Sequence, residues 1–266
     1  MADSPLPLAE RGDADLPGHW LLARLGKRVL RPGGLELTTR LLSAARIEGA
    51  DVVELGPGLG RTATDIVARK PHSYVGVDDT AAATEQVRSI VAPVGGTVVV
   101  ADAVSTGLPK ASADVVVGEA MLTMQGDKAK RAIIGEAFRV LRPGGRYAIH
   151  ELGLTPDGLS QDIKDDIRRD MSRAIKVNAR PLTTAEWTTL LTDAGFEISR
   201  VDHAPMALLN PARVLADEGP LGALRIVGNL IRRPAARRRV IGMRKTFQRY
   251  RHSLTAVAVV GVVPGQ

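Results

Sequence analysis

Cysteine is absent from this 266-residue chain, and aromatic residues make up only 3% of it. Without cysteine the chain can form no disulfide, no thiolate metal site and no cysteine nucleophile. Because aromatic side chains are scarce, a core must be built mainly from Val, Leu, Ile and Ala, which the 44% hydrophobic content allows. No stretch approaches the roughly 18 uninterrupted apolar residues of a membrane-spanning helix, and residues 1–15 are acidic rather than signal-like. We therefore expect a cytoplasmic protein.

The net charge of +7 comes from one segment of the chain. Residues 213–251 contain 11 Lys or Arg and 2 Asp or Glu, whereas the rest contains 25 basic and 27 acidic residues. Two stretches that cover most of this segment carry apolar residues at helical spacing with arginines opposite: Pro211–Arg233 and Ala235–Tyr250. Three interpretations stay open: a helical cap that packs on the core and lines a substrate pocket, a surface for anionic lipid headgroups or an acidic substrate, and an RNA-binding surface.

The most informative stretch is a glycine-rich loop between a strand pattern at Asp51–Leu55 and a helix pattern at Arg61–Lys70. Glycines let the backbone turn tightly and approach a ligand, and the following helix offers free N–H groups at its start. The spacing differs from the G-x-G-x-x-G of dinucleotide sites, and taken alone it also fits an ordinary strand-to-helix turn. An acidic residue precedes three glycines at alternate positions, in the order Glu54, Gly56, Gly58 and Gly60.

Strand and helix patterns alternate from Asp51 onward, which predicts an α/β fold with a mostly parallel sheet. The expected strands are Asp51–Leu55, Ser73–Asp78, Thr97–Ala101, Asp114–Glu119, Arg146–Glu151, Glu197–Asp202 and Leu254–Val263. The expected helices are Arg61–Lys70, Thr80–Ala92, Lys128–Leu141 and Thr184–Ala194, preceded by helical patterns around Leu21–Val29 and Leu35–Ala45. Two further segments, Thr155–Leu182 and Ala207–Ser253, interrupt the alternation.

The glycine loop resembles motif I of the class I, Rossmann-like S-adenosylmethionine (SAM)-dependent methyltransferases, and the resemblance extends over about Asp51–Asp202. It implies a seven-stranded Rossmann-like sheet with helices on both faces and an antiparallel last strand. It also implies SAM as the cofactor and S-adenosylhomocysteine as its product. The layout is most similar to the ubiquinone/menaquinone-type small-molecule branch, which implies in-line methyl transfer to a small-molecule acceptor.

The same resemblance assigns cofactor contacts to the glycine loop and to residues at the carboxyl ends of the strands, where ligands gather in open parallel sheets. By this resemblance Asp78 accepts hydrogen bonds from the ribose hydroxyls. Asp102 faces the adenine amino group, with the backbone of Ala103 beside the ring. Glu54 opens the loop, and Glu119 lies beside the methionine part of SAM or the acceptor. Asp102 also fits a loop residue that bonds its own backbone.

A general base assists the transfer if the acceptor atom carries a proton. The candidate catalytic residues are His150, Glu119 and His19, with Glu151 and His203 behind them. Histidine titrates near neutrality, and the end of a strand is well placed to reach a ligand. Two plainer interpretations stay open: a buried His150 satisfied by a backbone carbonyl, and a surface His19 at the start of a helix. We expect no metal site.

We expect three parts: an N-terminal helical cap at 1–50, a SAM-binding core at 51–206 and 253–266 with a helical lid at 155–182, and a basic helical insertion at 207–252. The expected partner is a small-molecule acceptor, with an anionic membrane surface reached through 213–251 as a further possibility. Alternatives are a phospholipid or RNA methyltransferase that uses this segment, and a non-catalytic SAM-binding module. Ribosomal-RNA adenine dimethyltransferases carry an Asn-x-Pro-Tyr-like motif where this chain has Gly118–Met121, which argues against adenine methylation.

Overall fold

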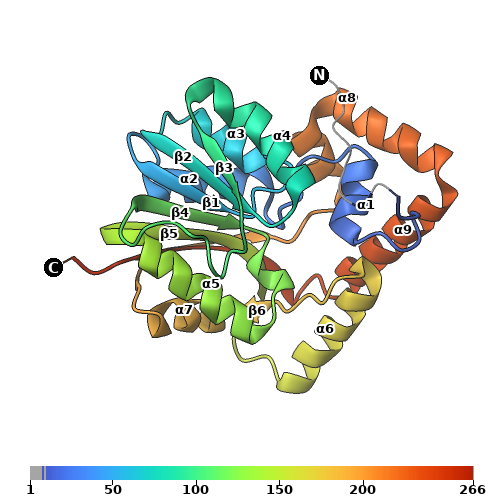
Figure 1. Cartoon of the computed structure of the whole chain (residues 1–266). Coiled ribbons are helices and arrows are strands. Elements are labelled where there is room, and N and C mark those ends of the chain that lie inside the picture. The colour runs from blue at the N-terminus through green and yellow to red at the C-terminus, as the bar shows by residue number, and fades with distance from the viewer. Residues whose placement is uncertain (1–7, 9, 266) are drawn as a thin grey trace.

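The computed structural model describes residues 8 and 10–265, which form one β-sheet with helices on both faces and a helical layer beside one end of it (Figure 1). The expected cap at 1–50 therefore lies partly outside the described residues. The strand order is β3-β2-β1-β4-β5-β8-β7, with β6 beside β5. The strands are β1 (Asp51–Leu55), β2 (Ser73–Asp78), β3 (Thr97–Val100), β4 (Ala113–Glu119), β5 (Leu141–Leu154), β6 (Leu182–Thr183), β7 (Glu197–Pro205) and β8 (Leu254–Val262).

Strand directions confirm the mostly parallel sheet that the alternation predicts. β8, the last strand, runs antiparallel to the other strands and pairs with β5 and β7, as the family resemblance implies. The strand number differs from the expected seven, because the two residues of β6 pair in parallel with Gly153 and Leu154. The central strands are apolar on both faces, which suits strands that helices cover on either side.

Two helical layers enclose the sheet (Figure 1). Helices α2, α3 and α4 contribute to the hydrophobic cluster on one face, and α5 and α7 contribute to the cluster on the other. Helix α7 begins with a capping box, in which Thr183 and Glu186 bond each other's backbone N–H groups. The bounds of these helices are α2 (Gly34–Ala45), α3 (Arg61–Val67), α4 (Ala81–Val91), α5 (Asp127–Val140) and α7 (Thr184–Asp193).

A third hydrophobic cluster joins α1 (Gly18–Arg24), α6 (Gln161–Ile175) and α9 (Pro234–Arg249) beyond one end of the sheet. The N-terminal helical pattern predicts a helix through Val29, but α1 ends at Arg24. The reason is Gly26, whose φ of 99° turns the chain, while the N–H of Lys27 bonds the carbonyl of Leu22. Leu25 and Val29 are nevertheless buried.

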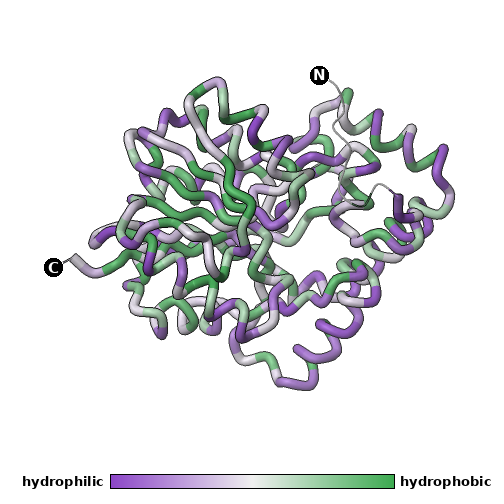
Figure 2. Tube along the Cα trace, viewed as in Figure 1, coloured by the Kyte–Doolittle hydropathy of each residue, from purple (hydrophilic) through white to green (hydrophobic). Residues whose placement is uncertain are grey.

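The basic segment corrects one expectation. Helix α9 packs through Ala236, Met243 and Phe247, as a cap would. Helix α8 (Pro211–Arg232) is bent at Gly219 and Pro220 and contains no fully buried residue. The apolar residues at helical spacing on α8 were expected to pack on the core, but they are exposed, so that expectation is wrong. These residues are Leu221, Leu224, Val227 and Ile231. Figure 2 shows apolar and polar residues alternating along this helix.

No helix among residues 8 and 10–265 is both long and apolar enough to cross a membrane.

Candidate cofactor site at the strand ends

A cavity of about 340 Å³ lies between the carboxyl ends of β1 to β4 and the segment that contains α1. This volume falls within the range of small-ligand sites, which is roughly 300–1,000 Å³. Most of the cofactor residues assigned by resemblance line it: Glu54, Gly56, Gly58, Asp78, Asp102, Ala103 and Glu119. His19 lines it too, whereas Gly60 and His150 do not. The strand ends therefore bring together residues that are far apart in the sequence.

The glycine loop is shaped by backbone angles that favour glycine. Gly56, Gly58 and Gly60 have φ values of 64°, 54° and 73°, a region in which other residues are strained. The N–H of Gly56 bonds the carbonyl of Val77 at 2.8 Å. A Cβ on Gly60 would lie 2.4 Å from Cδ1 of Ile90, so any larger residue there would require the Ile90 side chain to shift.

Asp78 joins the end of β2 to that loop. Its Oδ2 accepts a hydrogen bond from the N–H of Gly58 at 3.2 Å, and its Oδ1 accepts one from the N–H of Thr80 at 2.9 Å. Burial raises the pKa of Asp78, and these two backbone hydrogen bonds act against that rise. The carboxyl group retains accepting capacity toward the cavity, because each of its oxygens offers more than one lone pair.

Asp102 and Ala103 follow β3. The Oδ1 of Asp102 accepts a hydrogen bond from the N–H of Val104 at 2.9 Å, and its carbonyl accepts one from Ser105. This is the backbone-bonding arrangement that the plainer interpretation predicts. Both residues also line the cavity, so the two interpretations are compatible.

Glu54 is buried at the start of the glycine loop. Its Oε2 accepts a hydrogen bond from the Tyr74 hydroxyl at 2.7 Å. Burial is the largest influence on this carboxyl group, and it raises the pKa of Glu54 to about 8 although the Tyr74 bond works in the opposite direction. The charge of Arg31 also acts against the rise, but burial outweighs it, so Glu54 is mostly protonated at neutral pH.

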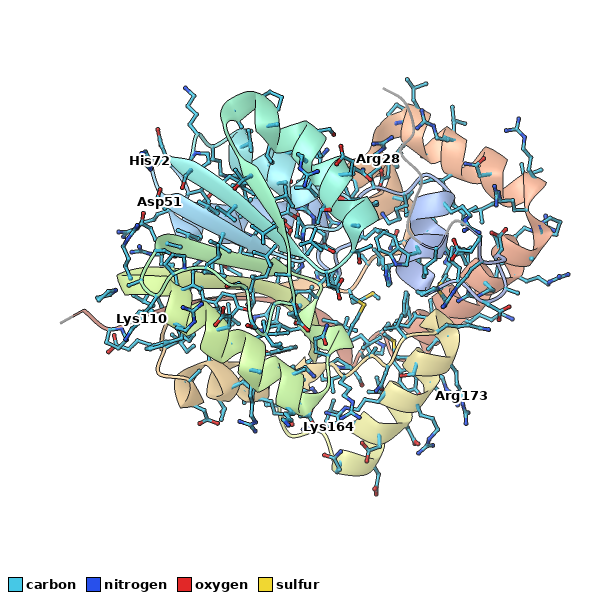
Figure 3. The ribbon with its side chains drawn as sticks, in the orientation of Figure 1. Arg28, Asp51, His72, Lys110, Lys164 and Arg173 are labelled. Atoms are coloured by element: carbon cyan, nitrogen blue, oxygen red, sulfur yellow. The ribbon has the colours of Figure 1, made fainter. Side chains whose placement is uncertain are left out.

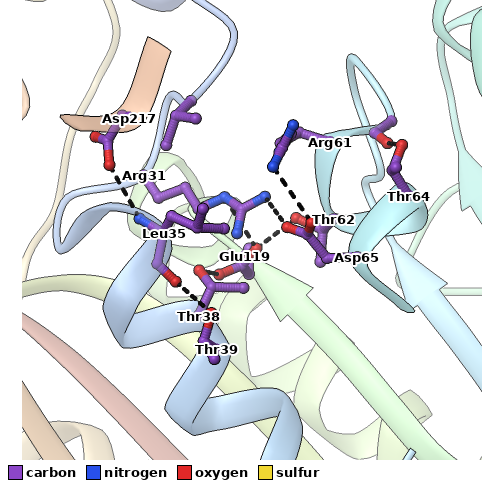
Figure 4. A network of polar contacts seen from close by, with 12 residues as sticks. Arg31, Leu35, Thr38, Thr39, Arg61, Thr62, Thr64, Asp65, Glu119 and Asp217 are labelled. Carbon is purple, nitrogen blue, oxygen red and sulfur yellow. Dashed lines mark hydrogen bonds and ion pairs between the residues drawn. The ribbon is translucent and has the colours of Figure 1, made fainter. Parts of the chain in front are cut away.

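Glu119, at the end of β4, is the centre of a network of polar contacts (Figure 4). The hydroxyls of Thr38 and Thr62 donate to its two oxygens, and Nδ1 of His150 lies 2.8 Å from Oε1. Arg31 forms an ion pair with it, with Nε 3.4 Å from Oε2. Burial would raise the pKa of Glu119, but the Arg31 charge and these hydrogen bonds lower it to about 2. Glu119 is therefore ionised.

His150 lies behind Glu119 and is completely buried. Its Nε2 accepts a hydrogen bond from the backbone N–H of Gly33 at 3.1 Å. The neutral ring then carries its proton on Nδ1, which faces Glu119. Because both nitrogens are engaged and the ring does not line the cavity, this geometry gives no support to His150 as the base that contacts an acceptor. The histidine is buried, as the plainer interpretation predicts, but its backbone partner is the N–H of Gly33 and not a carbonyl.

The other candidate bases also lie away from the cavity wall, except His19. Glu151 is completely buried and accepts hydrogen bonds from the N–H groups of Met121, Leu122 and Thr123. His203, on β7, bonds the hydroxyl of Thr184 at 2.9 Å.

His19 lies on α1 and contributes to the cavity wall. Its ring centroid is 4.8 Å from that of Trp20. Burial lowers the pKa of His19 to about 4. The ring is consequently neutral, and able to accept a proton, throughout the physiological pH range.

Arg31 is the main functional candidate that sequence reasoning missed. It lies in the loop between α1 and α2, lines the cavity, and pairs with Asp65 at 3.1 Å as well as with Glu119. Its Nη1 is buried without a hydrogen-bond partner. Thr38 and Thr62 were missed as well. The only sequence signal was the position of Thr62 directly after the glycine loop.

No group of His, Asp and Glu among residues 8 and 10–265 is arranged to hold a metal ion.

Comparison with known proteins agrees with this site. Residues 52–145 match the family described as "Methyltransferase domain". An uncharacterized protein of Haemophilus influenzae is 33% identical over 250 residues, which cover 92% of this chain and 97% of that protein. A probable S-adenosylmethionine-dependent methyltransferase of Mycolicibacterium smegmatis is 33% identical over 155 residues, 58% of this chain and 55% of that protein.

A solved structure shares the fold. It is Haemonchus contortus phospholethanolamine N-methyltransferase 2 in complex with phosphomonomethylethanolamine and S-adenosylhomocysteine. The TM-score is 0.70 at 16% identity, and the similarity covers 97% of this chain and 59% of that one.

Proposed function

We propose that this chain, a SAM-dependent methyltransferase by its methyltransferase domain and its similarity to a probable SAM-dependent methyltransferase, methylates a small molecule bound in the cavity between the strand ends and α1. One observation carries the proposal. Residues from four different strand ends, each assigned to the cofactor by family resemblance, line the same cavity, and His19 lines it as well.

The lining fits SAM at both ends of that molecule. Asp78 and Asp102 offer carboxyl oxygens that can accept hydrogen bonds from ribose and adenine donors. Toward the amino-acid end, the unpaired Nη1 of Arg31 suits a carboxylate, and the carboxyl groups of Glu54 and Glu119 suit an ammonium group. When bound, SAM supplies a methyl group on a sulfonium sulfur, a leaving group that needs no further activation by the protein.

The proposed tasks of the chain are alignment and proton removal. Fixing the reacting groups in line can contribute about 7–11 kcal/mol, and a general base adds to this when the acceptor carries a proton. We assign the base role to His19, because it is neutral and lines the cavity. Glu119 is already ionised and accepts several hydrogen bonds, so we assign it a binding role. His150 is a positioning residue that holds Glu119.

The acceptor that the cavity suits best is apolar or aromatic, in keeping with the ubiquinone/menaquinone-type branch. Apolar side chains form much of the wall outside the carboxyl groups, and they are Trp20, Leu30, Met121, Met124 and Ile133. A second candidate is a phosphate-bearing acceptor. Arg28 favours it, because it lines the cavity and its side chain forms no ion pair with any described residue.

Turnover with defined acceptors tests both candidates. The purified chain is incubated with SAM and, separately, with quinols, simple phenols and phosphobases, and S-adenosylhomocysteine and methylated product are measured by mass spectrometry. We expect product with apolar or phenolic acceptors and much less from His19→Ala. Product from phosphobases alone would select the second candidate. Tight SAM binding with no product from any acceptor would contradict catalysis and favour a SAM-binding module.

A further inference from the structure

The second half of α8, residues 220–232, presents an apolar stripe to the solvent. Leu221 is 82% exposed, Leu224 68%, Val227 51% and Ile231 66%. Spacings of three and four residues place these side chains on one face of the helix. They are four of the ten large hydrophobic side chains that the described residues leave exposed. A stripe this continuous marks an interaction surface, whereas single exposed apolar residues do not.

The opposite face of α8 explains why the stripe points outward. Nδ2 of Asn229 donates a hydrogen bond to the carbonyl of Leu25 at 3.1 Å. Leu230 packs against the third hydrophobic cluster. The helix is thus held to the protein by its other side, and it lies along the molecular edge farthest from α5 and α7 (Figure 1).

The charge around the stripe has a single sign. Residues 219–266 contain ten Lys or Arg and no Asp or Glu. On α8 itself, Arg225 and Arg232 are exposed next to the stripe, and neither forms an ion pair with any residue that the structure describes. The exposed face of α9 adds four more cations that pair with no described residue: Arg237, Arg238, Arg244 and Lys245. An occupant of this surface must therefore be negative at its boundary and apolar within.

Two kinds of macromolecule meet this requirement less well. A second copy of the chain would bring the same arginines face to face, which costs free energy. A nucleic acid would be attracted by the arginines, but it gains little from exposed Leu, Val and Ile. Single-stranded binding also relies on aromatic stacking. Residues 211–253 contain only two Phe, Tyr or Trp side chains: Phe247 is buried, and the half-buried Tyr250 is held by a hydrogen bond from its hydroxyl to Asp170 at 2.7 Å.

We propose that the second half of α8 docks on an anionic lipid bilayer, which makes the protein peripheral to a membrane. Its four aliphatic side chains enter the boundary between headgroups and acyl chains, and the arginines of α8 and α9 contact acidic headgroups. The helix is too short and too charged to span the membrane, and this interfacial arrangement does not require it to.

The docking helix is connected directly to the cavity wall. Oε1 of Glu218, just before the bend, accepts hydrogen bonds at 2.9 Å from the N–H groups of Arg28 and Val29. Arg28 lines the cavity, and Figure 3 shows it close to α8. The membrane surface thus lies close to the segment that forms one side of the proposed acceptor site.

Vesicle co-sedimentation of the full chain tests the proposal. Phosphatidylcholine vesicles are compared with vesicles that also contain phosphatidylglycerol, each at low and high salt. We expect binding only to the anionic vesicles and weakening with salt. Arg225→Gln/Arg232→Gln should weaken it by about 30-fold, and Leu221→Gln/Leu224→Gln by about ten-fold or more.

A matched control keeps the test specific. Val94 is 60% exposed and Ile163 is 45% exposed on other helices, so Val94→Gln/Ile163→Gln also replaces two exposed aliphatic side chains by glutamine and should leave vesicle binding unchanged. SAM binding by each variant verifies that it is folded. Absence of binding to anionic vesicles overturns the proposal. An equal loss of vesicle binding in the control variant also overturns it. So does a dimer of the protein that the Leu221/Leu224 variant breaks. Tight RNA binding that the arginine variant abolishes, without vesicle binding, overturns it as well.

Discussion

Nδ1 of His150 lies 2.8 Å from Oε1 of Glu119, and this contact joins β5 to the ionised carboxylate at the end of β4. The other nitrogen of the ring accepts the N–H of Gly33, directly before α2. A single buried side chain therefore fixes the distance between the sheet and the loop that carries Arg31. His150 acts on the cavity through Glu119.

This arrangement predicts the effect of His150→Ala. We expect SAM to bind about ten-fold more weakly, because Glu119 loses a donor, and the free energy of unfolding to fall by about 2–4 kcal/mol from the cavity and the unpaired Gly33 N–H. Calorimetric titration and urea unfolding measure the two effects. His203→Ala, on exposed β7, is the control and should change neither. Wild-type SAM affinity with turnover lowered more than a thousandfold would instead identify His150 as the base.

The proposed base, His19, makes a prediction about pH. His19→Ala should lower kcat by about 10²–10⁴-fold, with the Kd for SAM nearly unchanged. Since burial lowers the pKa of His19 to about 4, the active neutral form persists as pH falls from 7 to 5 and is lost only near pH 4. An activity profile that instead halves near pH 6.5, the value of an unperturbed histidine, would contradict this assignment.

Two adjacent carboxylates test the ribose contact. Asp78→Asn should weaken SAM binding by about 100-fold, because the residue loses a charge and one of the two oxygens that accept from the Gly58 and Thr80 N–H groups. Asp79→Asn is the matched control, since Asp79 bonds only the Thr80 hydroxyl among the described residues. Isothermal titration of both variants decides the matter. Loss of affinity in Asp79→Asn alone would move the role to that neighbour.

Proton release tests the position of the SAM ammonium group. Burial raises the pKa of Glu54 to about 8, so the carboxyl group is protonated at pH 7 in the free protein. A cation placed beside it lowers that pKa again, and binding should release up to one proton. Titrations in buffers of different ionisation enthalpy measure the release. Glu54→Gln should release correspondingly less; an identical number in both proteins would place the cation elsewhere.

Glycine substitutions separate backbone strain from cofactor contact. Gly58 and Gly95 have φ values of 54° and 78°, and an added Cβ at either meets no atom closer than 3.9 Å. Gly58→Ala and Gly95→Ala should therefore each lower the free energy of unfolding by about 1–2 kcal/mol. Only Gly58→Ala should weaken SAM binding, because only Gly58 lines the cavity. Equal SAM affinity in the two variants would count against the loop as a binding element.

The sequence predicts the sheet well because its signals are local. Apolar runs, the glycine turns and the capping box at Thr183 depend on neighbouring residues, and the strands and helices they predict are present within a few residues of the expected ends. The two-residue strand β6 escaped because so short a segment carries no periodicity. The end of α1 also depends on one local residue, because Gly26 adopts a positive φ that ends the helix before Val29.

The site was harder to predict where it depends on contacts between distant segments. The carboxyl groups at the strand ends could be placed because topology alone brings strand ends together. Arg31 pairs with residues 34 and 88 positions away along the chain, and no local pattern distinguishes it from the other arginines. The apolar stripe of α8 was recognised as a stripe, but sequence periodicity does not reveal whether such a face meets protein or solvent.

The placement of β8 has a consequence for biosynthesis. This strand is bonded on both sides, to β5 and to β7, although 48 residues separate it from β7 in the sequence. Until the ribosome has produced the whole α8–α9 hairpin and the strand behind it, β5 and β7 each keep an open edge that can recruit other nascent chains. A frameshift or stop codon anywhere ahead of Leu254 should consequently yield aggregates rather than a shortened but working enzyme.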